Sequence, residues 1–197
     1  MFYKIVRIVI GSIIRVFYPI KVLNKEKLPK EGSLILCPNH SSNFDPVFVS
    51  IGLDRNISWM AKEELFKSKI LSFLLYKLDA FPVDREGSDI AAIKKALRAL
   101  KNNKVLGLFP EGTRIESYSL DNAKPGVALL SIKSKASVLP VFIDSNYKIF
   151  NKTRIYVGDV MDLRDHEGYK ENPKDYANLS KEILRKIYEL KAEEEAN

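Results

Sequence analysis

The sequence predicts an α/β fold with a largely parallel central sheet flanked by helices. Short apolar runs rich in Val, Ile, Leu and Phe alternate along the chain with longer segments of helical periodicity. Runs that are apolar at consecutive positions are typical of strands covered on both faces, and the intervening helices provide the crossovers of a parallel sheet. With 197 residues, 46% of them hydrophobic, the chain is long enough for one such domain.

Charge and cysteine content exclude several classes of protein. Cys37 is a single cysteine, which excludes an internal disulfide framework, and only His40 and His166 are available to complete a structural zinc site. The net charge is +7, and residues 1–30 hold seven Lys/Arg against one acid, Glu26. A basic end on a nearly neutral body favours a polyanionic surface as partner.

The first expected helix covers residues 1–21, MFYKIVRIVIGSIIRVFYPIK. Lys4, Arg7 and Arg15 share one narrow stripe, and apolar side chains fill the rest of the circumference. The longest uncharged run is 8–14, whereas a bilayer span needs about 20 apolar residues. We therefore expect an amphipathic, membrane-associating helix whose basic side chains reach lipid phosphates on an anionic membrane surface.

Other interpretations of this helix remain open: a cleaved signal peptide, or a first helix packed on the core. Nucleic acid is not expected as a partner, because the basic residues are few and their neighbours are aliphatic. A polar linker is expected at 22–32. The domain organisation is thus an N-terminal helix and linker at 1–30, followed by the α/β domain at 31–197.

The body contains six expected strands and five expected helices. The strands are Ser33–Cys37, Ile57–Met60, Ala80–Val83, Val105–Phe109, Val138–Ile143 and Arg154–Val157. The helices are Pro46–Gly52, Glu63–Leu78, Ser88–Asn102, Pro125–Ser134 and Lys174–Glu194.

Three of these elements carry more specific expectations. Asp45 is expected as the N-cap of the helix that Pro46 begins. The helix at 63–78 is apolar apart from lysines and serines, so it is interpreted as buried, or else as a second membrane-facing patch. Pro140 suggests that its strand is bent or lies at a sheet edge.

The segment Asn39–Pro46 directly follows a strand and holds the first candidate for chemistry. Asp45 is five residues after His40, and a turn can bring its carboxylate onto one imidazole nitrogen. Such a pair lacks a nucleophile, since Ser41 and Ser42 are too close to His40 and the chain contains no G-x-S-x-G motif. His40 is therefore expected to activate a bound hydroxyl as a general base.

Two further strand ends offer anion-binding groups. Arg85 closes the segment Phe81–Arg85 and is a candidate clamp through its planar guanidinium. In Phe109–Arg114, backbone N–H groups, Thr113 and Arg114 can hold a phosphate, and Glu111 can hold a hydroxyl. Ligands of parallel α/β sheets bind at the carboxyl ends of strands, so these segments should meet there.

Together, the segments N-H-S-S-N-F-D, F-P-V-D-R, F-P-E-G-T-R and V-L-P-V resemble, in order and spacing, the four blocks of the glycerolipid acyltransferases. Among these, the chain is similar to bacterial 1-acyl-sn-glycerol-3-phosphate acyltransferases. The resemblance implies transfer of a fatty acyl group to the free hydroxyl of lysophosphatidic acid, giving phosphatidic acid in phospholipid biosynthesis. The donor is an acyl-carrier-protein thioester, a coenzyme A thioester or an acyl phosphate. No metal or prosthetic group is implied.

The resemblance also implies roles for individual residues. His40 deprotonates the hydroxyl and Asp45 orients His40. The groups that position the glycerol phosphate lie in three segments: Arg85, Glu111, Gly112, Thr113, Arg114 and Lys62. Pro140 belongs to a block that serves acyl-side binding or structure. The implied location is the cytoplasmic face of the cell membrane, as a peripheral or monotopic protein.

Three alternatives stay open. An acyltransferase with another lysophospholipid acceptor would carry the same motifs. A hydrolase would use the His–Asp pair on water, although the missing nucleophile motif counts against the serine version. A non-catalytic lipid-binding or membrane-scaffold protein would have no need of the His40–Asp45 pair.

Overall fold

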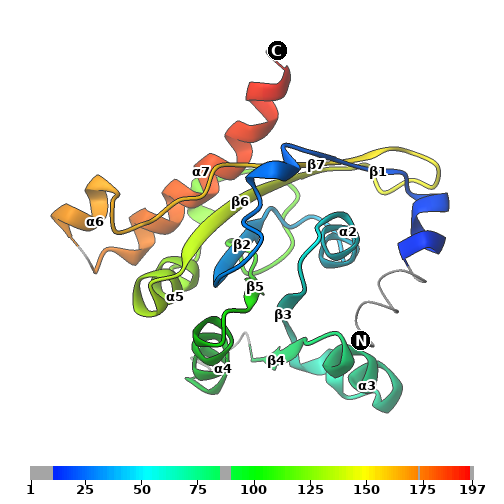
Figure 1. Ribbon diagram of the computed structural model, residues 1–197, viewed down its shortest axis with the longest axis horizontal. Helices are drawn as coiled ribbons and strands as arrows, with labels where there is room; N and C mark the ends of the chain where they lie inside the picture. Colours follow the sequence, from blue (N-terminus) through cyan, green and yellow to red (C-terminus); the bar gives the residue numbers. More distant parts are fainter. Residues whose placement is uncertain (1–10, 85–89, 173, 196–197) are drawn as a thin grey trace.

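A seven-stranded sheet forms the centre of the protein in the computed structural model, which describes residues 11–84, 90–172 and 174–195 (Figure 1). The strands are β1 (Ile20–Leu23), β2 (Leu34–Pro38), β3 (Ile57–Lys62), β4 (Phe81–Val83), β5 (Val105–Gly107), β6 (Ser137–Asp144) and β7 (Thr153–Val157). Their order is β1-β7-β6-β2-β5-β3-β4, and every neighbouring pair is parallel except β6–β7. The predicted α/β fold with a largely parallel sheet is confirmed.

The helices follow the expected pattern with shifted ends. They are α2 (Asp45–Gly52), α3 (Lys69–Lys77), α4 (Ile90–Lys101), α5 (Gly126–Ser134), α6 (Glu167–Glu171) and α7 (Tyr176–Glu195), with 3-10 turns η1 (Lys25–Lys27), η2 (Glu63–Phe66) and η3 (Leu120–Asn122). Residues 11–17 are also helical. The helix expected at 63–78 divides into η2 and α3, and α6 was not anticipated. Among the described helices, none combines the length and the apolar character needed to cross a bilayer.

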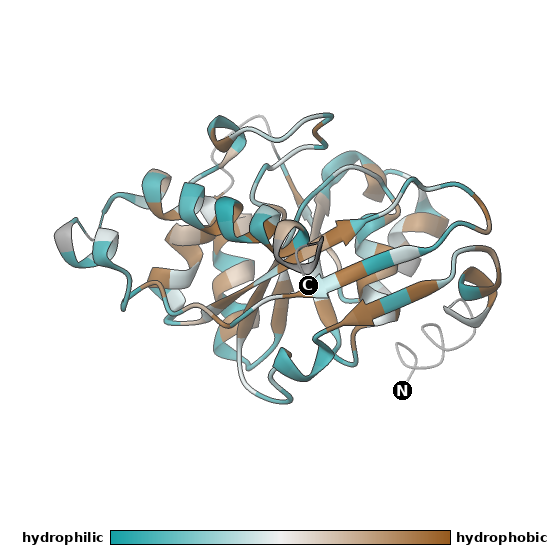
Figure 2. Cartoon of the chain, turned by 90° about the horizontal axis from the view of Figure 1, so that it is seen from above, coloured by the Kyte–Doolittle hydropathy of each residue, from teal (hydrophilic) through white to brown (hydrophobic). Residues whose placement is uncertain are grey.

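Strand β2 shows why both faces of the sheet are covered. Its side chains alternate, so Ile35 and Cys37 join the cluster formed with α4, α5 and α7, whereas Leu34 and Leu36 join the cluster formed with α2. All four are fully buried or nearly so. Figure 2 shows the same arrangement, with hydrophobic strands inside and hydrophilic helix faces outside. The consecutive apolar run at 34–37 thus reflects two cores divided by one sheet.

Strand β1 corrects the expected N-terminal helix and linker. Helix 11–17 ends before Pro19, and residues 20–23 pair in parallel with β7, Ile20 with Thr153 through Leu23 with Tyr156. Proline disfavours helix for the residue before it and lacks the N–H that a continued helix would need. Ile20 and Val22 then pack against the core. The linker expected at 22–32 therefore begins inside the sheet.

Pro140 lies in a central strand, so the expected edge position is wrong. Strand β6 pairs with β2 on one side and β7 on the other, and Pro140 is in register with Cys37. The ladder with β7 starts one residue later, at Val141, so the missing N–H of proline leaves no gap in it. Gly158 donates to the Pro140 carbonyl at 2.9 Å, and a Cβ there would lie 2.9 Å from Pro140 Cγ. The ring requires glycine opposite it.

Helix α3 is largely exposed, which contradicts the interpretation of this segment as buried. Ile70 is 86% exposed, and Leu71, Phe73 and Tyr76 are also accessible to solvent. Phe66 of η2 packs on Tyr76 with ring centroids 5.0 Å apart, and Phe66 and Leu75 pack, partly buried, against the core. The outward faces remain apolar, as the alternative of a second membrane-facing patch requires.

Candidate active site

The carboxyl ends of four parallel strands bring the sequence motifs together. Strands β2, β5, β3 and β4 are neighbours in that order, so their ends lie along one edge of the sheet. Residues 39–45 follow β2, residues 108–114 follow β5, and Lys62 ends β3. Arg85 comes two residues after β4 and lies outside the described residues.

The His40–Asp45 pair forms at this edge. The His40 Nδ1 atom is 3.0 Å from Asp45 Oδ2, and the same oxygen accepts the Ser41 and Ser42 backbone N–H groups at 2.8 and 2.7 Å. Asp45 is 0% exposed and His40 is 6% exposed. Because a carboxylate surrounded by donors can only accept, Nδ1 carries the hydrogen and Nε2 of the neutral ring keeps a lone pair. That lone pair can take a proton.

The residues between β2 and α2 favour the contact between His40 and Asp45. Asp45 is the first residue of α2 and Phe44 is its N-cap, one residue earlier than expected. A carboxylate is favoured at a helix N-terminus, where backbone N–H groups lack helical partners. The Asn39 side chain holds the start of the turn by pairing with the Ile143 backbone at 2.6 and 3.2 Å. The turn is thus fixed at both ends.

Tyr147 is a contact that sequence reasoning did not identify. Its hydroxyl donates to Asp45 Oδ1 at 2.7 Å, across 102 residues of sequence. It stands in the loop between β6 and β7, a segment in which no motif was recognised. The one local signal is an isolated tyrosine between Asn146 and Lys148, which does not distinguish a surface residue from a buried partner.

Aromatic rings form the wall behind His40. Its imidazole stacks on Phe109 with centroids 3.8 Å apart, and Phe109 stacks on Trp59 at 5.2 Å. The Trp59 indole occupies the space next to Gly107, where a Cβ atom would collide with three of its ring carbons. Glycine in β5 therefore lets the indole support the ring stack that orients His40.

The loop after β5 is fastened to the turn that carries His40. The Ile115 N–H donates to the His40 carbonyl at 2.9 Å, and the Lys124 N–H donates to the Pro110 carbonyl at 2.8 Å. Gly112 has φ of 69°, a left-handed conformation that glycine adopts without strain. The side chains of Thr113 and Arg114 are exposed beyond this turn. They are available to an anion arriving from solvent.

Glu111 is placed differently from its neighbours, because it is only 1% exposed. Its Oε1 accepts from the Tyr188 hydroxyl of α7 at 3.4 Å, and Oε2 has no hydrogen-bond partner among the described residues. Burial raises the pKa of this carboxyl to about 7, while hydrogen bonds from the backbones of Glu111 and His40 and from Tyr188 lower it. The sequence analysis predicted that the Glu111 carboxylate holds a substrate hydroxyl. In the structure this carboxyl group is buried inside the protein.

Lys62 and Cys37 are not hydrogen-bonded to the His40–Asp45 pair, which we call the dyad. Lys62 is exposed at the end of β3 and pairs with Glu64 at 3.0 Å. Cys37 is fully buried, and burial raises the pKa of its thiol well above the usual value, so it behaves as a small apolar side chain. Within the described ranges, no three His, Cys, Asp or Glu side chains are grouped so that they can hold a metal ion.

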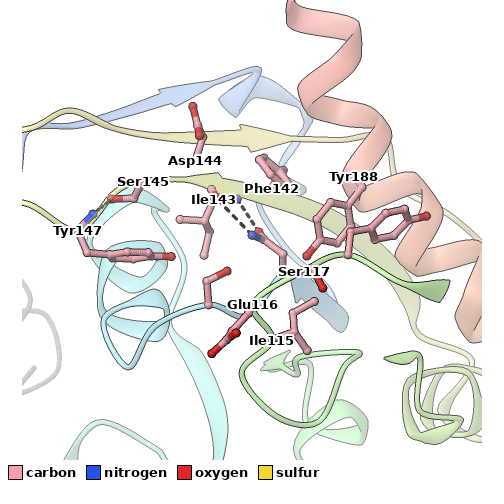
Figure 3. Close-up of a pocket in the computed structure, with 12 residues that line it drawn as sticks. Ile115, Glu116, Ser117, Phe142, Ile143, Asp144, Ser145, Tyr147 and Tyr188 are labelled. Carbon is pink, nitrogen blue, oxygen red and sulfur yellow. Dashed lines mark hydrogen bonds between the residues drawn. The ribbon is translucent and has the colours of Figure 1, made fainter. Parts of the chain in front are cut away.

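A cavity of about 190 Å³ opens beside the dyad. Figure 3 shows Tyr147 and Tyr188 on opposite sides of it, with residues 115–117 below and 142–145 above. Tyr118 completes the wall together with Asn39 and Ser41, which flank His40 in the chain. Its described lining contains two acids, Glu116 and Asp144, and no lysine or arginine. Of the described residues expected to hold the glycerol phosphate, none lines this cavity.

Comparisons with known proteins agree with this arrangement. Residues 19–144 match the family model described as Acyltransferase. The chain is 32% identical over 180 residues to a 1-acyl-sn-glycerol-3-phosphate acyltransferase of Bacillus subtilis, with 87% of each chain covered. It is 34% identical over 121 residues to a Streptococcus pneumoniae protein of the same name, a match that covers 60% of this chain and 44% of that one.

The fold is also that of a solved structure. The crystal structure of the 1-acyl-sn-glycerophosphate (LPA) acyltransferase PlsC from Thermotoga maritima superposes with a TM-score of 0.74 at 23% identity, covering 96% of this chain and 81% of that one. At this identity the likeness shows the fold alone. The family match, in contrast, spans both the turn that carries His40 and Asp45 and the loop at 109–114. On that match, the chain belongs to the acyltransferase family.

Proposed function

We propose that the protein transfers a fatty acyl group from an activated donor to the sn-2 hydroxyl of 1-acyl-sn-glycerol-3-phosphate, giving phosphatidic acid. The observation that carries the proposal is the 3.0 Å contact between His40 Nδ1 and a fully buried Asp45. It leaves Nε2 as the proton acceptor, and among the described residues no serine or cysteine side chain is hydrogen-bonded to the His40 ring. The names of the relatives support 1-acyl-sn-glycerol-3-phosphate as the acceptor.

The chemistry follows from the geometry. The acceptor hydroxyl gives its proton to His40 Nε2 while its oxygen bonds to the acyl carbonyl carbon. The bond from that carbon to the donor's sulfur, or to oxygen in an acyl phosphate, then breaks. The leaving group takes the proton back from His40, so the imidazole is restored. Asp45 stabilises the imidazolium formed in between and keeps its tautomer fixed.

Product analysis tests the proposal directly. The protein is incubated with lysophosphatidic acid and, separately, with acyl-carrier-protein thioester, coenzyme A thioester and acyl phosphate, and products are identified by mass spectrometry. Phosphatidic acid carrying the donor's acyl chain is the expected product. Free fatty acid without transfer would indicate the hydrolase alternative, and a product formed only from another lysophospholipid would replace the acceptor. No turnover at all would favour a lipid-binding protein.

Arg114 supports binding of the acceptor's phosphate. It is exposed next to the left-handed turn at Gly112, and a guanidinium pairs with phosphate through charge-assisted hydrogen bonds. Replacing Arg114 with alanine should raise KM for lysophosphatidic acid by about 10- to 100-fold, the loss expected for hydrogen bonds to a charged group. The change in kcat should be smaller. Initial rates over a range of acceptor concentrations measure both.

The control for this variant is Arg164→Ala. Arg164 is also an exposed arginine, and it pairs with Asp162 in the loop after β7. Its removal should leave KM unchanged. An unaltered dependence on lysophosphatidic acid in Arg114→Ala would remove Arg114 from the phosphate site.

Apolar side chains on helix 11–17 support a docking site on an anionic membrane, which we place at the cytoplasmic face. Ile13, Val16 and Phe17 are exposed, and Phe150 of the β6–β7 loop lies against Phe17 with ring centroids 6.0 Å apart. Arg15 is exposed, but its Nη2 donates to the Ile51 carbonyl at 2.8 Å, so the guanidinium is held by the protein rather than extended toward lipid phosphates. The helix therefore presents its apolar side outward. Lys4 and Arg7 lie outside the described residues.

Replacing Val16 with aspartate should reduce binding to phosphatidylglycerol vesicles several-fold. The change removes an apolar side chain that is 65% exposed and adds a charge that both the acyl region and the anionic headgroups disfavour. Co-sedimentation with vesicles measures the bound fraction. Val160→Asp is the matched control, because Val160 is an exposed valine in the loop after β7. Equal binding of all three proteins would move the contact to another surface, with α3 as the next candidate.

A further inference from the structure

The two oxygens of the Asp45 carboxylate have different partners. Oδ2 faces His40 Nδ1 and the Ser41 and Ser42 N–H groups. Oδ1 accepts from the Tyr147 hydroxyl at 2.7 Å. Since the carboxylate is fully buried, an oxygen without a donor would be both removed from water and unpaired, which is unfavourable. The residues near Asp45 in sequence donate to Oδ2, and Tyr147 supplies the donor for Oδ1.

The loop is built to hold Tyr147 in this position. Its backbone adopts φ of 56°, which is uncommon for a residue with a side chain, and its N–H donates to Ser145 Oγ at 3.1 Å. Ser145 Oγ is in turn 2.8 Å from Thr153 Oγ1 on β7. The ring lies nearly parallel to Phe48 of α2, with an interplanar angle of 12°. A left-handed residue that persists in a tight loop indicates that the surrounding contacts determine it.

Burial and the charged groups around the dyad keep the Tyr147 hydroxyl protonated, so that it acts as a hydrogen-bond donor. Asp45 is faced by His40 and Tyr147, and by Glu111 and Tyr188 from the loop after β5 and from α7. Burial and the neighbouring Asp45 raise the pKa of Tyr147, so its hydroxyl stays protonated and remains a donor. A donor on Oδ1 draws part of the carboxylate charge away from Oδ2. The charge that His40 meets therefore depends on Tyr147.

We propose that Tyr147 is a positioning residue for the acyl transfer: its hydroxyl fixes the second oxygen of Asp45 and thereby sets both the orientation and the basicity of His40. This inference rests on the proposed function, in which His40 acts as general base. Tyr147 belongs to neither the His40–Asp45 motif nor the loop at 109–114. It acts on the proton transfer through Asp45 rather than by touching the reacting atoms.

Tyr147→Phe tests the proposal with the smallest possible change. Without the donor, the carboxylate acts on the imidazolium with its full charge, so His40 stays protonated to a higher pH. The acid limb of the kcat profile should move to higher pH by about half a unit or more, and kcat on that limb should fall by about threefold or more. A loss of loop structure alone would lower the rate at every pH without moving the limb. An unmoved limb therefore overturns the proposal.

Tyr18→Phe is the matched control. The Tyr18 ring also packs on Phe48, at 5.3 Å between centroids, and the variant removes the same hydroxyl. Among the described residues, it is Tyr147 and not Tyr18 whose hydroxyl is hydrogen-bonded to Asp45. Its profile should follow that of the wild type. Thermal unfolding of both variants shows whether they fold equally well.

A second measurement separates this proposal from the proposed function. The imidazole resonances of the two histidines are followed by NMR over pH, with His166, the N-cap of α6, as internal reference. In Tyr147→Phe the His40 midpoint should rise and the His166 midpoint should not change. This readout needs no substrate, so it holds even if the acceptor is a different lipid. Equal His40 midpoints in wild type and variant would contradict the role of Tyr147.

Discussion

Replacing His40 with alanine should reduce acyl transfer by about 100- to 10,000-fold, the range that a general base contributes. The imidazole supplies the proton acceptor, and no other described side chain takes its place on Asp45 Oδ2. Turnover of the donor with lysophosphatidic acid, followed by mass spectrometry, measures the loss. The KM for the acceptor should change little, because His40 acts on the proton rather than on the phosphate.

Folding must be separated from chemistry in this variant. The His40 ring is buried against Phe109, so its removal leaves a space behind the dyad as well as an Asp45 oxygen without its donor. His40→Asn fills more of that space and can still donate to Asp45, but it cannot accept a proton. It should be as inactive as the alanine variant and more stable. His166→Ala, at the only other histidine of the chain, should retain full activity. A His40→Asn protein with near wild-type turnover would remove the general base from the mechanism.

Most of the sheet could be predicted, because the pattern that defines it is local. Six strands, and the parallel direction of the central ones, follow from apolar runs separated by helices. Strand β1 was missed because its four residues continue an apolar, basic helix without a polar break. Pro19 was the available signal, since a helix rarely continues through such a position. The strand is also stabilised by β7, which lies more than 130 residues later.

In the candidate site, too, contacts between residues near in sequence could be predicted, and contacts between distant residues could not. The His40–Asp45 pair was predictable, since five residues and one turn connect the two groups and a helix start favours the carboxylate. Tyr147 was not, because its contact depends on how β6 leaves the sheet and returns as β7. Glu111 was predicted only in part. Its loop was identified from the sequence, but the inward direction of its side chain depends on α7, which supplies Tyr188.

Burial of Glu111 should make the protein lose stability as the pH rises from about 4.5 to about 7. In the folded state its pKa is raised to about 7 from the model-peptide value of 4.5, because the protein shields the carboxyl from water. In that window the unfolded chain has released the proton and the folded chain still holds it, so each rise in pH favours unfolding. The loss is complete above pH 7 and amounts to about 3 kcal/mol, at about 1.36 kcal/mol per pKa unit.

Glu111→Gln removes this dependence, since an amide has the shape of the protonated acid and does not ionise. The variant and the wild type should have similar free energies of unfolding in urea at pH 4.5. By pH 8 the variant should be the more stable of the two by up to about 3 kcal/mol. Glu116→Gln is the matched control: Glu116 is exposed five residues further along the same loop, so its difference from the wild type should stay constant with pH. If the Glu111→Gln difference also stayed constant, the carboxyl would have to be ionised inside the folded protein. Its partner would then have to be something other than the 3.4 Å contact with Tyr188.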